Sequence, residues 1–96
     1  MPSYTEALER VKAVLHGITS RKMMGEYLLY RNGKLFGGIY DNRLLIKITK
    51  LSAILLAHCP SDFPYEGGGE MIRVSEPYDA ELLGKVVDGM CGPSQD

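Results

Sequence analysis

The sequence predicts an α+β fold, a two-layer sandwich in which helices cover an antiparallel sheet. Two observations predict this class. Between residues 22 and 47, apolar and aromatic residues flank Asn32-Gly33, the strongest short-range signal for a type I′ hairpin turn. Outside that stretch, apolar residues recur at helical spacing in three separate segments. The expected order is therefore helix, strand, strand, strand, helix, strand, strand, helix, within a single domain spanning residues 1–96.

The first helix is expected from about Tyr4 to His16. Ser3 and Glu6 form a capping-box pattern, in which each side chain bonds to the backbone of the other residue. Gly17 is a natural C-terminal stop. The apolar residues that recur at helical spacing are Ala7, Leu8, Val11, Val14, Leu15 and Ile18.

Three strands are expected between Lys22 and Lys47, joined by two-residue turns at Asn32-Gly33 and Asp41-Asn42. These turns set a register that pairs Leu29 with Phe36. The register predicts one nearly all-apolar face beneath the helices. Its members are Leu28, Tyr30, Leu35, Ile39, Leu44, Ile46 and Ile48.

The opposite face of this sheet is expected to combine aromatic, apolar and basic residues. They are Tyr27, Leu29, Phe36, Tyr40, Arg43, Leu45 and Lys47. A solvent-facing side of an antiparallel sheet is normally polar, so this face is the candidate interaction surface. The alternative is that a helix or the C-terminal segment covers it. Gly37-Gly38 within the middle strand indicates a bulge or a close backbone approach.

The second helix is expected from about Lys50 to His58, ended by Pro60, and the third is capped by Asp79 and closed by Gly92-Pro93. Two short strands, 63–65 and 71–74, flank the glycines 67–69. The tail from about residue 92 is expected to fray.

Composition bounds the function. The chain has 96 residues, 45% of them hydrophobic, with a net charge of −1, which argues against bulk nucleic-acid binding. It has neither a membrane-length apolar run nor a signal pattern, so we expect a cytoplasmic protein with no membrane partner. Two cysteines, Cys59 and Cys91, are expected as free thiols.

Charge is unevenly distributed along the sequence. Residues 21–50 hold seven basic residues against two acidic ones, whereas residues 51–96 hold eight acidic residues against two basic ones. The two halves could lie side by side and neutralise each other. Alternatively, the basic residues could form a rim around the aromatic face and steer an acidic partner towards it.

Three patterns invite a chemical interpretation, and each has a simpler one. The triple glycine at 67–69 is flanked by Glu66 and Glu70, which would repel a phosphate, so it is read as a hairpin tip. Adjacent residues on a helix diverge, so His58 and Cys59 do not make a catalytic pair with each other. The histidines and cysteines lack zinc-site spacing. We therefore expect no catalytic, metal or cofactor-binding residues.

A family resemblance rests on Arg21-Lys22-Met23-Met24-Gly25, Tyr27, Tyr30, Gly33, Phe36, Ile39-Tyr40-Asp41, Leu44 and Lys47. These residues resemble the N-terminal domain of the TfoX (Sxy) competence regulators, in which Phe is usual at the position of Met24. The resemblance implies an α+β domain of the same element order and no catalytic residues. It also implies a role in gene regulation, since the full-length regulators promote expression of DNA-uptake genes together with a catabolite-sensing activator. Those regulators carry a second, helical domain.

The leading hypothesis is a non-enzymatic regulatory or protein-interaction module that forms a homodimer. Its further protein partner would be a regulator or part of the transcription machinery. The alternative is a small-molecule-binding domain that uses the aromatic sheet face and the glycine-rich loop. Direct nucleic-acid binding through the basic strands ranks lowest.

Overall fold

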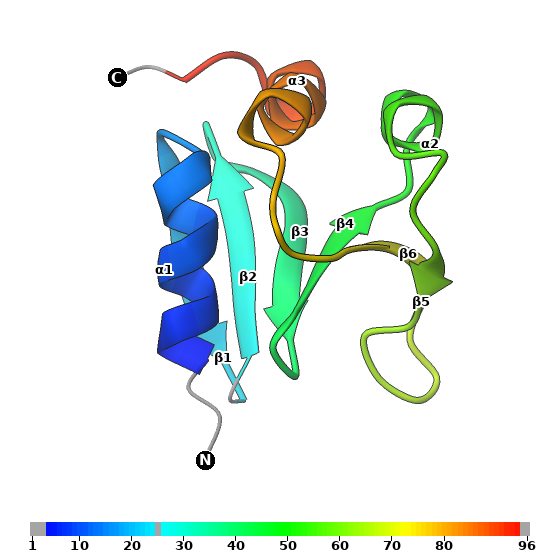
Figure 1. Ribbon diagram of the computed structural model, residues 1–96. Coiled ribbons are helices and arrows are strands. Elements are labelled where there is room, and N and C mark those ends of the chain that lie inside the picture. The colour runs from blue at the N-terminus through cyan, green and yellow to red at the C-terminus, as the bar shows by residue number, and fades with distance from the viewer. Residues whose placement is uncertain (1–3, 25, 95–96) are drawn as a thin grey trace.

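The structure is a computed structural model that describes residues 4–24 and 26–94. It has the predicted α+β class, with helices packed on a six-stranded antiparallel sheet of strand order β1-β2-β3-β4-β6-β5 (Figure 1). The elements are α1 (Tyr4–Val14), β1 (Ile18–Met23), β2 (Glu26–Arg31), β3 (Lys34–Tyr40), β4 (Arg43–Lys47), α2 (Lys50–Leu55), β5 (Ser61–Asp62), β6 (Met71–Val74) and α3 (Ala80–Cys91).

The strand β1 corrects the predicted element order, which had three strands before the second helix. It pairs antiparallel with β2 along its whole length, from Ile18 opposite Arg31 to Met23 opposite Glu26. The segment Thr19-Ser20-Arg21-Lys22 shows no apolar alternation, because an edge strand with both faces largely exposed needs none. Sequence periodicity therefore could not reveal it.

Both predicted hairpin turns are confirmed. Asn32 and Gly33 have φ of 53° and 77°, and Asp41 and Asn42 have φ of 53° and 62°. Positive φ at both central residues is what a type I′ turn requires, and it matches the twist of the strands that the turn joins.

The predicted register holds next to these turns and fails farther along β2. Tyr30 lies opposite Leu35 as expected, but Leu29 then lies opposite Gly37 rather than Phe36. Phe36 is thus the extra residue of a β-bulge. Because side chains alternate between faces, the bulge moves that part of β2 to the other face relative to β3 and β4.

The glycine pair Gly37-Gly38 directly follows the bulged residue and lies at a close approach between strands. A Cβ on Gly37 would lie 2.3 Å from the Leu45 carbonyl oxygen, so another backbone approaches closely. A Cβ on Gly38 would lie 2.7 Å from the Tyr40 ring. The predicted bulge and the predicted close approach therefore both occur.

The core lies between the helices and one face of the sheet. In Figure 1, α1 runs alongside β2, and α3 crosses near the ends of β2 and β3. Burial of a large apolar side chain in such a layer contributes about 1.5–3 kcal/mol. The buried residues are Ala7, Leu8, Val11, Leu15, Leu29, Phe36, Ile39, Leu44, Ile46, Leu56, Ile72, Val74, Leu83, Val86, Val87 and Cys91.

The helix boundaries agree with expectation more closely at α3 than at α1 or α2. The Asp79 carboxylate accepts a hydrogen bond from the Leu82 amide, and Gly92 ends α3 with φ of 89°. The expected cap at Ser3 lies outside the described residues, and α1 ends at Val14 rather than His16. The helix α2 is capped by Thr49 and ends at Leu55, three residues before the predicted end.

One expectation about the later segments is wrong. The short strand before the glycines is Ser61–Asp62, so residues 63–65 form a connection instead. After α3, the Asn32 side-chain amide donates hydrogen bonds to the carbonyl oxygens of Cys91 and Pro93. The expected fraying of the tail stays a prediction.

Candidate interaction surface

The seven residues of the predicted interaction surface do not lie on one face. Tyr27, Leu29 and Phe36 pack in or against the core beneath the helices. Tyr40, Arg43 and Leu45 belong to the other side of the sheet, and Lys47 is exposed at the end of β4. The bulge at Phe36 causes this division. It moves residues 27–29 of β2 to the opposite face from the predicted one, relative to β3 and β4.

The structure presents a different apolar surface on the side of the sheet away from the core. A groove of about 580 Å³ lies there, at the β1–β2 hairpin and the end of β3. We call it the sheet-face groove, and it is lined by Met23, Met24, Glu26, Leu28, Tyr40 and Tyr65. None of these residues belongs to a helix.

Three apolar residues of the sheet-face groove are exposed to solvent. Met24 is 96% exposed, Tyr65 60% and Met23 46%. Met24 also has φ of 52°, a left-handed conformation that costs a non-glycine residue about 1–2 kcal/mol. The hairpin thus presents an apolar side chain to solvent from an unfavourable backbone conformation, a combination that is frequent at functional surfaces.

Tyr40 forms a buried wall of the sheet-face groove. Its ring covers Gly38, which has no side chain to displace it, and only 8% of the residue is exposed. Burial, supported by the negative charge of Glu26, raises the pKa of the Tyr40 hydroxyl. The hydroxyl therefore stays protonated at neutral pH and can donate a hydrogen bond.

Arg43 positions the opposite wall, which carries Tyr65. Its guanidinium donates to the Asp62 carboxylate at 2.8 Å, to the Phe63 carbonyl at 3.0 Å and to the Pro64 carbonyl at 3.3 Å. The Phe63 amide and then Arg43 lower the pKa of Asp62, which also accepts a hydrogen bond from Arg73 at 3.2 Å. Arg43 therefore acts as an anchor for the β5–β6 connection.

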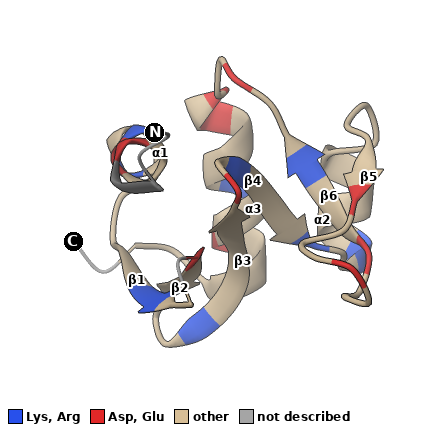
Figure 2. Cartoon of the chain, turned by 90° about the horizontal axis from the view of Figure 1, so that it is seen from below, with Lys and Arg blue, Asp and Glu red and all other residues tan. Residues whose placement is uncertain are grey.

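Ion pairs join the basic first half of the sequence to the acidic second half. Arg31, only 3% exposed, pairs with Asp88 and donates two hydrogen bonds to the His16 carbonyl oxygen. Arg43, in the first half, likewise forms an ion pair with Asp62, in the second half, at 2.8 Å. Figure 2 shows basic residues on β1, β3 and β6 and acidic ones on α3 and β5. For these pairs, mutual neutralisation of the two halves is the correct alternative.

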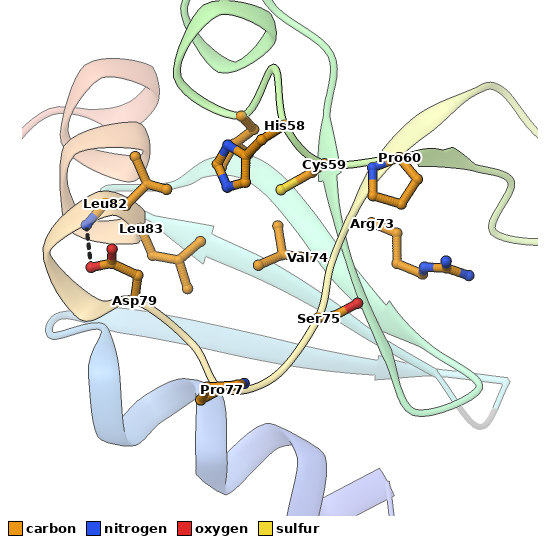
Figure 3. A pocket seen from close by; sticks show the side chains of 11 residues that line it. His58, Cys59, Pro60, Arg73, Val74, Ser75, Pro77, Asp79, Leu82 and Leu83 are labelled. Carbon is orange, nitrogen blue, oxygen red and sulfur yellow. Dashed lines mark hydrogen bonds between the residues drawn. The ribbon is translucent and has the colours of Figure 1, made fainter.

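His58 and Cys59 line a smaller cavity of about 300 Å³ between the end of α2 and the start of α3 (Figure 3). Burial raises the pKa of the Cys59 thiol, which opposes formation of a nucleophilic thiolate. Asp79 is engaged as the α3 cap, and the Arg73 guanidinium points away from His58 and Cys59 in Figure 3. The arrangement supplies no activated nucleophile.

The cysteines, the possible metal ligands and the helices give three further observations. Both cysteines are free thiols, as expected. Over residues 4–24 and 26–94, no cluster of three or more His, Cys, Asp or Glu side chains could hold a metal ion. In the same part of the chain, every helix is too short or too polar to cross a membrane.

No protein-family model matches the chain, and comparisons with curated proteins and with solved structures also found no match. The similarity to the TfoX N-terminal domain therefore stays a prediction from residues 21–47.

Tyr40 is the one groove residue that also belongs to the predicted interaction surface. The sequence predicts Leu28 beneath the helices and Tyr65 in a strand, whereas both line the groove. Met23-Met24 is the signal in the sequence that points to the groove, because two large apolar residues stand at a hairpin tip, where polar residues are usual. That signal indicates a hairpin tip only once β1 is known to be a strand.

Proposed function

We propose that this chain is a non-enzymatic protein-interaction module that associates with a second copy of itself through the sheet-face groove. The observation that carries the proposal is the exposure of Met23, Met24 and Tyr65 around a single apolar groove. Exposed apolar groups gathered in one concave surface commonly mark a contact with another protein. The other exposed large apolar residues, Ile48, Ile54 and Phe63, do not line this groove.

A second copy fits this face because the face carries both signs of charge. Arg21 lies opposite Leu28 in the β1–β2 ladder, and Glu26 lies opposite Met23, so both charged residues lie on the side that bears the groove. A two-fold axis through the groove would bring the basic side of one copy against the acidic side of the other. The net charge of −1 adds little repulsion.

Gene regulation is the setting that we propose for this module. The support is the resemblance of residues 21–47 to the N-terminal domain of competence regulators. In that setting, the dimer would present its remaining surface to a regulator or to the transcription machinery.

The test replaces the exposed methionines and measures self-association by sedimentation equilibrium. We expect Met23→Ser/Met24→Ser to raise the dimer dissociation constant by about tenfold or more, equivalent to about 1.4 kcal/mol. Neither side chain is in the core, so the melting temperature of the monomer should change little.

The matched control is Ile54→Ser on α2. Ile54 is 66% exposed and does not line the groove, so its replacement removes apolar surface elsewhere. Equal dissociation constants for the wild type and the methionine variant, or an equal loss in the Ile54 control, would overturn the proposal.

A small-molecule site in the same groove is the second candidate. Its volume of about 580 Å³ lies within the usual range for ligand pockets, and the Tyr40 hydroxyl and Glu26 supply polar groups. A metabolite that binds there should raise the melting temperature of the wild type and not that of Tyr65→Ala. Equal shifts in both proteins would place the ligand elsewhere.

A further inference from the structure

A second groove, distinct from the sheet-face groove, lies where the start of β3 and the end of β4 meet α2 and α3. It has a volume of about 560 Å³ and shares no residue with the sheet-face groove. We call it the lysine groove. It is lined by Lys34, Leu35, Lys47, Thr49, Lys50, Leu51, Gly89 and Met90.

The apolar part of the lysine groove is built by close packing of α2 on α3. A Cβ on Gly89 would lie 1.9 Å from the Leu51 Cδ2 atom, so the Leu51 side chain occupies the space beside Gly89 on α3. Leu35, Leu51 and Met90 are each partly buried, which leaves part of each side chain open to the groove.

The three lysines come from three different elements. Lys34 begins β3 directly after the Asn32-Gly33 turn, Lys47 ends β4, and Lys50 begins α2. Lys34 and Lys47 both line the groove. Burial raises the pKa of the nearby Cys91 thiol, and Arg31, Lys34 and Lys47 oppose that shift.

The positive charge of these lysines is not balanced by neighbouring carboxylates. All three are exposed, and none takes part in an ion pair within the described residues. Asp88, next to Gly89 in the sequence, is engaged by Arg31. The groove thus combines an apolar floor with a rim of three uncompensated positive charges.

We propose that the lysine groove binds an acidic amphipathic segment of another protein. Apolar side chains of that segment would contact Leu35, Leu51 and Met90, while its carboxylates pair with the lysines. Helix-in-groove recognition uses this combination of apolar anchors and complementary charge. A nucleic-acid backbone would leave the apolar floor unused, and a flat bilayer cannot enter a concave site. The inference does not depend on self-association through the sheet-face groove.

The probe is a labelled synthetic peptide of about four helical turns, with leucines at helical spacing and glutamates elsewhere. Binding to the full chain is followed by fluorescence anisotropy at low ionic strength and at ~0.15 M. We expect measurable binding that weakens with salt. The triple variant Lys34→Gln/Lys47→Gln/Lys50→Gln should bind about tenfold more weakly or worse.

Two matched controls separate specific docking from general electrostatics. The variant Lys12→Gln/Lys22→Gln/Lys85→Gln removes the same charge from exposed positions outside the groove and should bind nearly as well as the wild type. A peptide with serines in place of the leucines should bind much more weakly than the amphipathic one.

Three results would overturn the proposal. The two triple variants could lose affinity equally, or the serine peptide could bind as well as the leucine peptide. Alternatively, vesicles of phosphatidylserine and phosphatidylcholine, or duplex DNA, could bind in a manner that needs the three groove lysines while the peptide does not bind. The last result would assign the groove to a membrane surface or to nucleic acid.

Discussion

At the scale of single residues, Gly38 decides whether Tyr40 can form the wall of the sheet-face groove. A Cβ there would lie 2.7 Å from both the Tyr27 carbonyl oxygen and the Tyr40 ring. We expect Gly38→Ala to lower the free energy of unfolding by about 1–3 kcal/mol, as overpacking does. In α3, Gly84 has nothing within 4 Å of the same position, so Gly84→Ala should stabilise the protein by about 0.5–1 kcal/mol. Urea denaturation measures both changes, and a neutral Gly38→Ala would contradict the close contact.

Arg31 is a second residue at which one side-chain type is required, because all three guanidinium nitrogens form hydrogen bonds. Its guanidinium bonds to the His16 carbonyl oxygen through two nitrogens and to Asp88 through a third, which one ammonium group cannot reproduce. We expect Arg31→Lys to lower the free energy of unfolding by about 1–3 kcal/mol. The exposed Arg21→Lys should change it by less than about 0.5 kcal/mol. Equal losses of unfolding free energy for Arg31→Lys and Arg21→Lys in denaturant titrations would show that the hydrogen bonds of the buried Arg31 guanidinium contribute nothing specific.

At the scale of elements, the sequence predicts those parts of the fold that depend on local chemistry. Asn32-Gly33, Asp41-Asn42 and the Asp79 cap act within a few residues, and the structure confirms all three. Gly37-Gly38 indicates a bulge in β3, but which residue is the extra one depends on contacts between strands, so the predicted register does not include the shift at Phe36. That single extra residue divided the predicted interaction surface, and of the groove members only Tyr40 was foreseen.

The cap of α2 supplies a prediction at the same scale. The Thr49 hydroxyl accepts a hydrogen bond from the Ser52 amide at 3.0 Å, and the buried Ser52 hydroxyl accepts one from the Thr49 amide at 2.8 Å. Since α2 has six residues, this reciprocal pair is a large part of its local stability. Thr49→Ala should cost about 1 kcal/mol in unfolding free energy, whereas Thr49→Ser keeps the oxygen and should cost much less. Similar losses in the two variants would contradict the role of the hydroxyl.

At the scale of the whole molecule, the ion pairs of Asp62 with Arg43 and Arg73 make the free energy of unfolding depend on pH. Its pKa is lowered in the folded state, so its contribution is present above its unfolded pKa of about 4 and is lost as the pH falls through the folded value. We expect Asp62→Asn to be less stable than the wild type near neutral pH, with the two unfolding free energies converging in acid. Urea titrations across this range test the sign, and parallel curves would refute it.

The contact between copies through the sheet-face groove is the central claim, and the molar mass of the wild-type chain in solution tests it most directly. Light scattering coupled to size exclusion, over a series of concentrations, should give twice the 10.6 kDa of one chain at high concentration and should approach one chain on dilution. Met23→Ser/Met24→Ser should remain at the mass of one chain to higher concentrations. A wild-type mass of one chain throughout the series would contradict the claim.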